Sequence, residues 1–248
     1  MLLLLQVVTG ASEGIGREFA IQFARAGFNV LLIARNQAKL DAVVDYISKP
    51  VKVRGIDSMQ TKTFIVDFAS ADEAKWEALL EEFKQIEVGV LVNNVGVSHE
   101  FPTDFVDTST EELANIINVN VTATLRVTSL IAPSMASRKA FLRTWSDALA
   151  AELAPKGILV EHANTYFVTS GMSKIRRASF FVPSERAFVR AVLAKLAPGT
   201  IVPYWTHALL GAAMALLPPK LVLAYTHSLL KNTRRRALAK QARLAKQE

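Results

Sequence analysis

The stretch Thr9-Gly10-Ala11-Ser12-Glu13-Gly14-Ile15-Gly16 decides the fold, because it follows the apolar run 2–8 and opens the helical pattern 15–26. A glycine-rich turn between a buried strand and a helix is typical of a site for the pyrophosphate of a dinucleotide. Gly10 permits the tight turn, Gly14 lets the backbone approach the phosphates, and Gly16 lets helix and strand pack closely. The N-terminus of the helix then faces the anion. The loop therefore predicts a nicotinamide dinucleotide held by Thr9, Gly10, Ser12, Gly14, Ile15 and Gly16.

Strands and helices alternate along the first hundred residues outward from this loop. Apolar runs predict buried strands, and segments with apolar residues at helical spacing predict the helices that connect them. The expected strands are 2–8, 29–33, 63–66 and 88–92, and the expected helices are 15–26, 37–47 and 71–83. This β-α-β-α rhythm predicts an α/β fold with a doubly wound parallel sheet of the Rossmann type.

The second half of the chain departs from this rhythm. Ser109 and Glu112 form a capping box that begins a helix reaching to about residue 134. A second helix follows directly, with apolar residues at i+4 spacing, and stops at Pro155-Lys156-Gly157. A doubly wound sheet needs a strand between two such crossover helices. We therefore expect the sheet to lack its fifth strand. Further strands are expected at 158–163 and 200–203, and a helix after Ser184.

The end of the second expected strand indicates which dinucleotide binds. A site specific for NAD places an acidic residue there for the ribose hydroxyls, but this chain has Ala34 followed by Arg35. An arginine can pair with the 2′-phosphate of NADP, so the sequence favours NADP(H) over NAD(H). The alternative is a solvated surface arginine. Asp67, at the end of the third strand, either hydrogen-bonds the adenine or caps the strand.

Asn93-Asn94-Val95-Gly96 follows the fourth strand and differs at one position from an N-N-A-G motif. Together with the glycine loop, it makes the chain resemble the short-chain dehydrogenase/reductase family. The stretches TGASEGIGREFA, GFNVLLIARN, LVNNVGVSHEFP, NVNVTATLRVTSL, AFLRTWSDALAAEL and NTYFVTSGMSKIRRASFFVPS resemble the branch that contains microsomal very-long-chain 3-oxoacyl-CoA reductases and 17β-hydroxysteroid dehydrogenases. The resemblance covers nearly the whole chain.

This resemblance implies the reduction of a carbonyl by hydride transfer from NADPH. In the family a serine polarises the carbonyl oxygen and the tyrosine of a Y-x-x-x-K motif donates the proton. The motif's lysine lowers the pKa of that tyrosine, and an asparagine, by position Asn120, completes the proton relay. The resemblance also implies that Asn94, Gly96 and Thr169 contact the cofactor; for Thr169 a plain loop hydroxyl is the alternative. It implies an acyl-CoA substrate, with a steroid as the alternative, and the cytosolic face of the endoplasmic reticulum membrane.

The catalytic half of this pattern is missing from the sequence. The four tyrosines are followed four residues later by Pro50, Ser170, Ala208 and Leu229, so no Y-x-x-x-K motif exists. We interpret this as an internal gap near 135–140 that removes a strand, the serine and the tyrosine. Lys139 is either the catalytic lysine or the last lysine of the preceding helix. Two hypotheses stay open: an impaired NADPH-dependent 3-oxoacyl-CoA reductase, and a catalytically dead remnant that binds cofactor or other proteins.

The charge is concentrated at the C-terminal end. The formal net charge is +7, and almost all of it belongs to residues 231–248, so residues 1–203 form the expected NADP(H)-binding domain and 204–248 a separate segment. This segment has apolar runs at 208–217 and 221–225, so we expect it to bind a membrane surface, with a dimer-packing helix as the alternative. Its lack of interleaved aromatic residues argues against nucleic acid. The chain has no cysteine and its four histidines lack metal-ligand spacing, so no metal site is expected. A homodimer or elongase-complex partners are further possible interactions.

Overall fold

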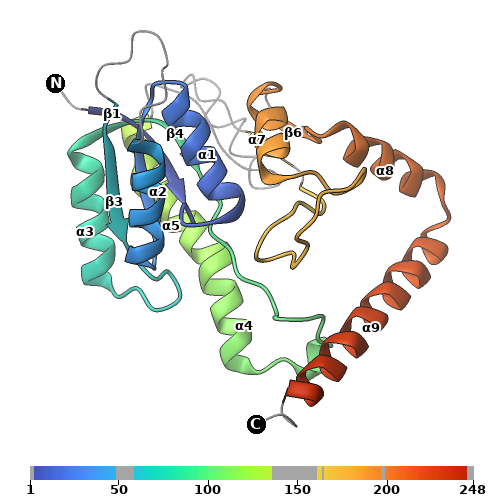
Figure 1. Ribbon diagram of the computed structural model, residues 1–248. Coiled ribbons are helices and arrows are strands. Elements are labelled where there is room, and N and C mark those ends of the chain that lie inside the picture. Colours follow the sequence, from blue (N-terminus) through green and yellow to red (C-terminus); the bar gives the residue numbers. More distant parts are fainter. Residues whose placement is uncertain (1–2, 49–58, 136–160, 164, 197–198, 245–248) are drawn as a thin grey trace.

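A computed structural model describes residues 3–48, 59–135, 161–163, 165–196 and 199–244 (Figure 1). Four parallel strands form the central sheet in the order β3-β2-β1-β4. Their bounds are β1 Leu3–Thr9, β2 Asn29–Ala34, β3 Thr61–Ile65 and β4 Ile86–Val92. The predicted α/β fold with a parallel sheet is confirmed in this part of the chain, and each predicted strand lies within three residues of its observed bounds.

Helices cover both faces of the sheet (Figure 1). On one face, α1 (Gly14–Arg25), α2 (Gln37–Ser48) and α7 (Glu185–Leu193) share a core with β1 and β2. On the other face, α3 (Glu73–Lys84) and α5 (Ala123–Met135) pack on the same strands. Both faces of a strand must then be apolar, which is why β1 and β2 read as continuous hydrophobic runs in the sequence.

Side-chain caps fix the start of three helices. Asp72 accepts a hydrogen bond from the backbone N–H of Lys75 at the start of α3, and Ser184 accepts one from Ala187 at the start of α7. Ser109 accepts one from Glu112 at the start of α4 (Thr110–Ile117), so the predicted capping serine is confirmed. The long helix predicted after it is interrupted by a π-helical turn, Asn118–Thr122, before it continues as α5.

The later strands do not join the central sheet. β5 (Glu161–Ala163) pairs in parallel with β6 (Gly199–Ile201) as a separate two-stranded sheet. Within the described ranges, no strand lies beyond β4 at that edge of the central sheet. The absence of a fifth strand stays a prediction, because residues 136–160 lie outside the described ranges. The helix predicted over 140–155 lies outside the described residues, as does the gap near 135–140.

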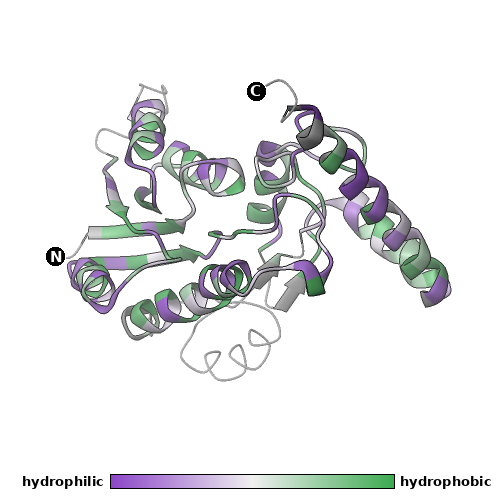
Figure 2. Cartoon of the chain, turned by 90° about the horizontal axis from the view of Figure 1, so that it is seen from below, coloured by the Kyte–Doolittle hydropathy of each residue, from purple (hydrophilic) through white to green (hydrophobic). Residues whose placement is uncertain are grey.

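The C-terminal segment is helical to residue 244. α8 (Trp205–Leu216) ends before Pro218, and α9 (Pro219–Leu244) continues through the basic residues, which the sequence did not predict as a helix. α9 stands away from the sheet, and its last turns return to the loop before α4, where Arg234 pairs with Asp104 and Asp107 (Figure 1). Hydrophobic residues gather in its first half and hydrophilic ones towards its end (Figure 2). Among the described helices, none is long and apolar enough to cross a bilayer.

Candidate functional site

A cleft of about 380 Å³ opens at the carboxyl ends of the four parallel strands. Ligands of open α/β sheets bind at this edge, where the loops after neighbouring strands meet. Eight of the residues predicted to bind cofactor line it: Gly10, Ser12, Gly14, Ile15, Arg35, Asp67, Asn94 and Gly96. The topology thus brings together side chains and backbone from the loops after β1, β2, β3 and β4.

The glycine loop is closely packed where it turns into α1. Gly10 and Gly14 both have positive φ, 65° and 59°, a region that side chains disfavour. A Cβ atom on Gly16 would lie 2.3 Å from the Gly10 carbonyl oxygen and 2.3 Å from the Asn94 Nδ2 atom. Gly16 therefore has no room for any side chain. It lies behind the cleft and does not line it. At Gly14 the nearest atom to a Cβ would be 3.6 Å away, so this part of the backbone stays accessible.

Thr9 and Asn94 join the glycine loop to the end of β4. The Thr9 hydroxyl accepts hydrogen bonds from the backbone N–H groups of Asn94 (3.0 Å) and Val95 (3.1 Å). The Asn94 Nδ2 donates to the carbonyl oxygens of Thr9 (3.1 Å) and Gly10 (3.3 Å). Thr9 is fully buried and does not line the cleft. The geometry therefore gives Thr9 a structural part, holding two loops in register.

Two ion pairs lie at the β2–β3 end of the cleft. Arg35 Nη1 is 3.7 Å from Asp67 Oδ2, and both side chains are well exposed. Asp67 Oδ1 also accepts from the backbone N–H of Ala69, so it caps the turn after β3 while it faces the cleft. Lys39, in the first turn of α2, pairs with Glu13 of the glycine loop at 2.8 Å. The sequence does not predict this second pair, although Lys39 follows the end of β2 by only five residues.

Asn120 lies in the π-helical turn and binds the loop after β4. Its Oδ1 accepts from the Val97 backbone N–H, and its Nδ2 donates to the Val97 carbonyl, both at 2.8 Å. Its amide is thus engaged on both sides by one residue of the loop. A Cβ on Gly96 would lie 3.4 Å from Asn120 Oδ1, so the loop passes close over the turn. Single π-helical turns inside α-helices are frequent at functional sites.

The loop after β5 lies beside the glycine loop and borders the cleft, with Ser170 next to Gly14. Thr165, Ser170, Gly171 and Met172 line the cleft. Thr169 does not: it is buried, and its hydroxyl donates to Glu185 Oε2 at 2.7 Å. Of the two alternatives for Thr169, the geometry supports the loop hydroxyl, because that hydroxyl connects the loop to the first turn of α7.

None of the four tyrosines of the chain lines the cleft, although all four are described. Tyr46 accepts a hydrogen bond from Arg25, and Tyr225 is exposed on α9. Tyr166 and Tyr204 both pack against His207 of α8, with their rings tilted to the imidazole. The ring centroid of His207 lies 5.3 Å from that of Tyr166 and 5.4 Å from that of Tyr204. Gly211 leaves room for the Tyr166 hydroxyl. The described cleft therefore has no phenol that could donate a proton.

One predicted catalytic residue has no described position. Lys139 lies outside the described residues. His99, after β4, pairs with Glu112 of α4 at 2.9 Å and does not line the cleft. No group of three or more His, Asp and Glu side chains that could hold a metal ion occurs in the described ranges.

The chain is similar to several known proteins. A family model described as short chain dehydrogenase matches residues 5–140. The very-long-chain 3-oxoacyl-CoA reductase of Coprinopsis cinerea is 46% identical, over 97% of this chain and 80% of its own length. The enzyme of the same name from Ajellomyces capsulatus is 42% identical, over 96% and 79%. A short-chain dehydrogenase from Sphingobium yanoikuyae, solved with NADPH, covers 88% of this chain and 97% of its own length with a TM-score of 0.64 and 21% identity, which shows a shared fold.

The length of these alignments bears on the expected gap. The aligned region with the Coprinopsis cinerea enzyme is 277 residues long, whereas the whole chain has 248. The relative therefore carries residues inside the aligned region that this chain lacks. The family match also ends at residue 140, beside the expected position of the gap. These two findings support an internal deletion.

Proposed function

Because this chain belongs to the short-chain dehydrogenase family, we propose that the cleft binds NADP(H). The observation that carries the proposal is the glycine loop: Gly10 and Gly16 leave no room for side chains beside Asn94, and Gly14 leaves its backbone open towards the cleft. Backbone N–H groups at the start of α1 then face the pyrophosphate. Arg35 supplies a guanidinium for the 2′-phosphate, at the end of the cleft where an NAD enzyme has an acidic residue.

Bound NADPH would supply a hydride to a carbonyl carbon, and the residues of this chain would orient it. Asn94 and Thr9 hold the glycine loop against the end of β4, which fixes the floor of the cleft. Asn120 holds the loop after β4 through Val97. Ser170 and Met172 close the opposite side. These contacts support the proposal that the described residues hold the cofactor.

We further propose that the substrate is a very-long-chain 3-oxoacyl-CoA, as in the relatives named above, and that this chain reduces it poorly. Hydride addition to a carbonyl leaves an oxyanion that must be stabilised and protonated. The described cleft has no tyrosine for this step, and the amide of Asn120 is occupied by Val97. Loss of both the proton donor and the oxyanion donor costs several orders of magnitude in rate. The alternative is a remnant that binds cofactor without turnover.

We place the chain at the cytosolic surface of the endoplasmic reticulum membrane, held by 204–248. Exposed apolar side chains on α8 and in the first half of α9 precede an exposed basic stretch, the pattern of an interfacial helix on an anionic bilayer. Pelleting with vesicles tests this: binding should require anionic lipid and should fall when 219–248 is removed. Equal binding to neutral vesicles would contradict the placement.

A direct test of the function separates binding from chemistry. NADPH fluorescence should rise on binding to the chain, with NADPH bound more tightly than NADH. Steady-state oxidation of NADPH with a long-chain 3-oxoacyl-CoA should be slow. Replacing residues 135–140 by the corresponding strand-Ser-Tyr segment of the Coprinopsis cinerea relative should restore turnover, and the same insert with Tyr→Phe is the matched control. Failure to bind NADPH would overturn the cofactor proposal, and rapid turnover without the insert would overturn the impairment.

A further inference from the structure

The segment Val168–Val182 forms a closed loop between the cleft and α8. At its base, the Thr169 N–H donates to the Pro183 carbonyl oxygen (3.0 Å). Before the segment returns to this base, Ser179 and Val182 exchange two backbone hydrogen bonds, 2.8 and 3.2 Å. A loop with closely spaced, bonded ends is compact and often functional. We call this segment the cation loop, because it carries Lys174, Arg176 and Arg177.

Ser173 fixes the conformation of the first turn of the cation loop. Its hydroxyl donates to the Val168 carbonyl oxygen (2.6 Å) and accepts from the backbone N–H groups of Ser170 (3.1 Å) and Ile175 (3.3 Å). The next residue, Lys174, has φ 58°, which is uncommon for a residue with a side chain. The backbone that carries the following residues is therefore held in one shape by local hydrogen bonds.

Three cations project from this fixed backbone without partners. Lys174, Arg176 and Arg177 are exposed, and within the described part of the chain none of the three side chains forms an ion pair or hydrogen bond. Like charges this close repel one another, and the repulsion is relieved when an anion binds between them. Before and within α4, Asp104 and Asp107 pair with Arg234 and Glu112 pairs with His99, whereas Glu111 forms no ion pair in the described ranges.

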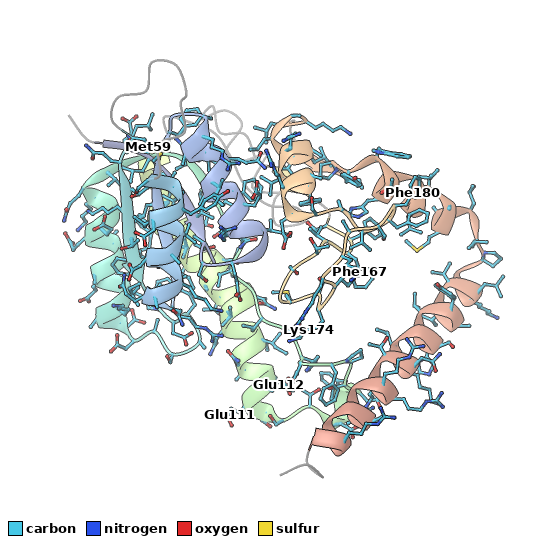
Figure 3. The ribbon with its side chains drawn as sticks, in the orientation of Figure 1. Met59, Glu111, Glu112, Phe167, Lys174 and Phe180 are labelled. Carbon is cyan, nitrogen blue, oxygen red and sulfur yellow. The ribbon has the colours of Figure 1, made fainter. Side chains whose placement is uncertain are left out.

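The cation loop adjoins the end of the cleft that would hold the reacting carbonyl. Met172 lines the cleft and its Cε lies 3.5 Å from the position of a Cβ on Gly96, beside Asn120. Arg35 and Asp67 are at the opposite end, on the loops after β2 and β3. Lys174 lies at the end of the loop that is remote from α8, whereas Phe180 lies beside α8 (Figure 3). Lys174, the first of the three cations, therefore lies on the loop that borders the substrate end of the cleft through Met172.

We propose that Lys174, Arg176 and Arg177 bind the phosphate groups of the coenzyme A part of the substrate. This inference rests on the proposed function, since it assumes a thioester whose carbonyl enters the cleft beside Met172. Coenzyme A carries a 3′-phosphate and a diphosphate, several negative charges on a flexible arm, and guanidinium and ammonium groups on a rigid loop suit them. Phospholipid headgroups offer the same phosphate chemistry, so the experiment includes both sources.

The test measures binding, because turnover is expected to be slow. The variant K174Q/R176Q/R177Q removes the three cations, and K62Q/K75Q/K84Q, on β3 and α3, is the control with the same change in charge. Dissociation constants are measured by calorimetry for free coenzyme A and for pantetheine, which has no phosphate, and by fluorescence for NADPH. Sedimentation with vesicles of neutral and anionic phosphatidyl lipids covers the second source.

We expect the loop variant to bind coenzyme A about tenfold more weakly at low salt, an effect that shrinks as salt screens the charges. Its affinity for pantetheine and NADPH should stay within twofold, and the control should bind coenzyme A as the parent does. The proposal would be overturned if the loop variant kept its coenzyme A affinity, or if the control lost as much of it. It would also be overturned if the loop variant lost as much affinity for NADPH, or if it lost only its binding to anionic vesicles. If the parent chain does not bind NADPH, the proposed function fails separately.

Discussion

At the scale of single residues, we expect Arg35 to be the side chain that most directly sets the choice of cofactor. It lines the cleft and pairs loosely with Asp67, 3.7 Å away, in an exposed position. A 2′-phosphate is a stronger partner for a guanidinium than one exposed carboxylate. Arg35→Ala should therefore weaken NADPH binding by about tenfold or more and leave NADH binding nearly unchanged. Fluorescence titration of both cofactors gives the ratio, with Lys84→Ala as a control on α3; an equal loss for NADH would show that Arg35 acts only through the fold.

Gly16 is limited by space rather than by backbone angle. Since a Cβ would lie 2.3 Å from the Gly10 carbonyl, Gly16→Ala should push the glycine loop away from α1 and cost about 1–3 kcal/mol of unfolding free energy. Gly14→Ala is the matched comparison, because it has positive φ but open space, and should cost about 1 kcal/mol. Urea unfolding measures both. A larger cost at Gly14 would contradict this packing account.

His207 gives the fold a dependence on pH. It is fully buried among Tyr166, Tyr204 and Phe188, and this burial lowers its pKa despite the backbone carbonyls of Phe181 and Phe167, which favour the protonated ring. The folded pKa is then below the unfolded one, about 6.5. The stability that depends on the neutral ring is present above that value and is lost as pH falls through the folded pKa.

The corresponding variant is His207→Gln, which can still donate to the Phe181 carbonyl but does not titrate. We expect the parent to lose stability between pH 7 and pH 5 more steeply than the variant does, as measured by urea unfolding at each pH. Parallel curves would show that His207 does not account for the pH dependence.

At the scale of elements, the π-helical turn between α4 and α5 positions the loop after β4. Asn120→Asp keeps an acceptor for the Val97 N–H but loses the donor to the Val97 carbonyl, whereas Asn120→Ala loses both. Each lost hydrogen bond should cost about 1 kcal/mol, so the alanine variant should be the less stable of the two. Both should bind NADPH more weakly, since Gly96 lines the cleft directly above this turn. Equal stability of Ala and Asp variants would show that only one of the two bonds matters.

The elements that the sequence could predict are those with a local signal. Strands buried on both faces, the cap at Ser109 and the glycine loop each follow from a few neighbouring residues. The π-helical turn could not be predicted, because the contact that accompanies it joins Asn120 to Val97, 23 residues away along the chain. The structural part of Thr169 depends in the same way on Glu185, which only the fold brings near. The pair of Lys39 and Glu13 likewise depends on the fold, because β1 and β2 are neighbours in the sheet and the segments after them meet.

At the scale of the whole molecule, the chain combines the cleft proposed to bind NADP(H) with a central sheet that ends, in the described ranges, at β4. The absence of a Y-x-x-x-K motif was visible in the sequence, and the alignments longer than the chain support the deletion. The path of α9 was not predictable, because a basic stretch gives no sign that Arg234 will reach Asp104 and Asp107. Sequencing the transcript across codons 134–140 would show whether a longer in-frame form exists.

The central claim is that this chain binds NADPH in the family's cradle but lacks the groups that protonate the product. The most direct test is the rate of NADPH oxidation with a long-chain 3-oxoacyl-CoA, measured at saturating NADPH for this chain and for the chain with the strand-Ser-Tyr segment inserted at 135–140. We predict a rate lower by at least about a hundredfold without the insert, since general acid catalysis alone contributes that much. Equal rates for the two chains would contradict the account.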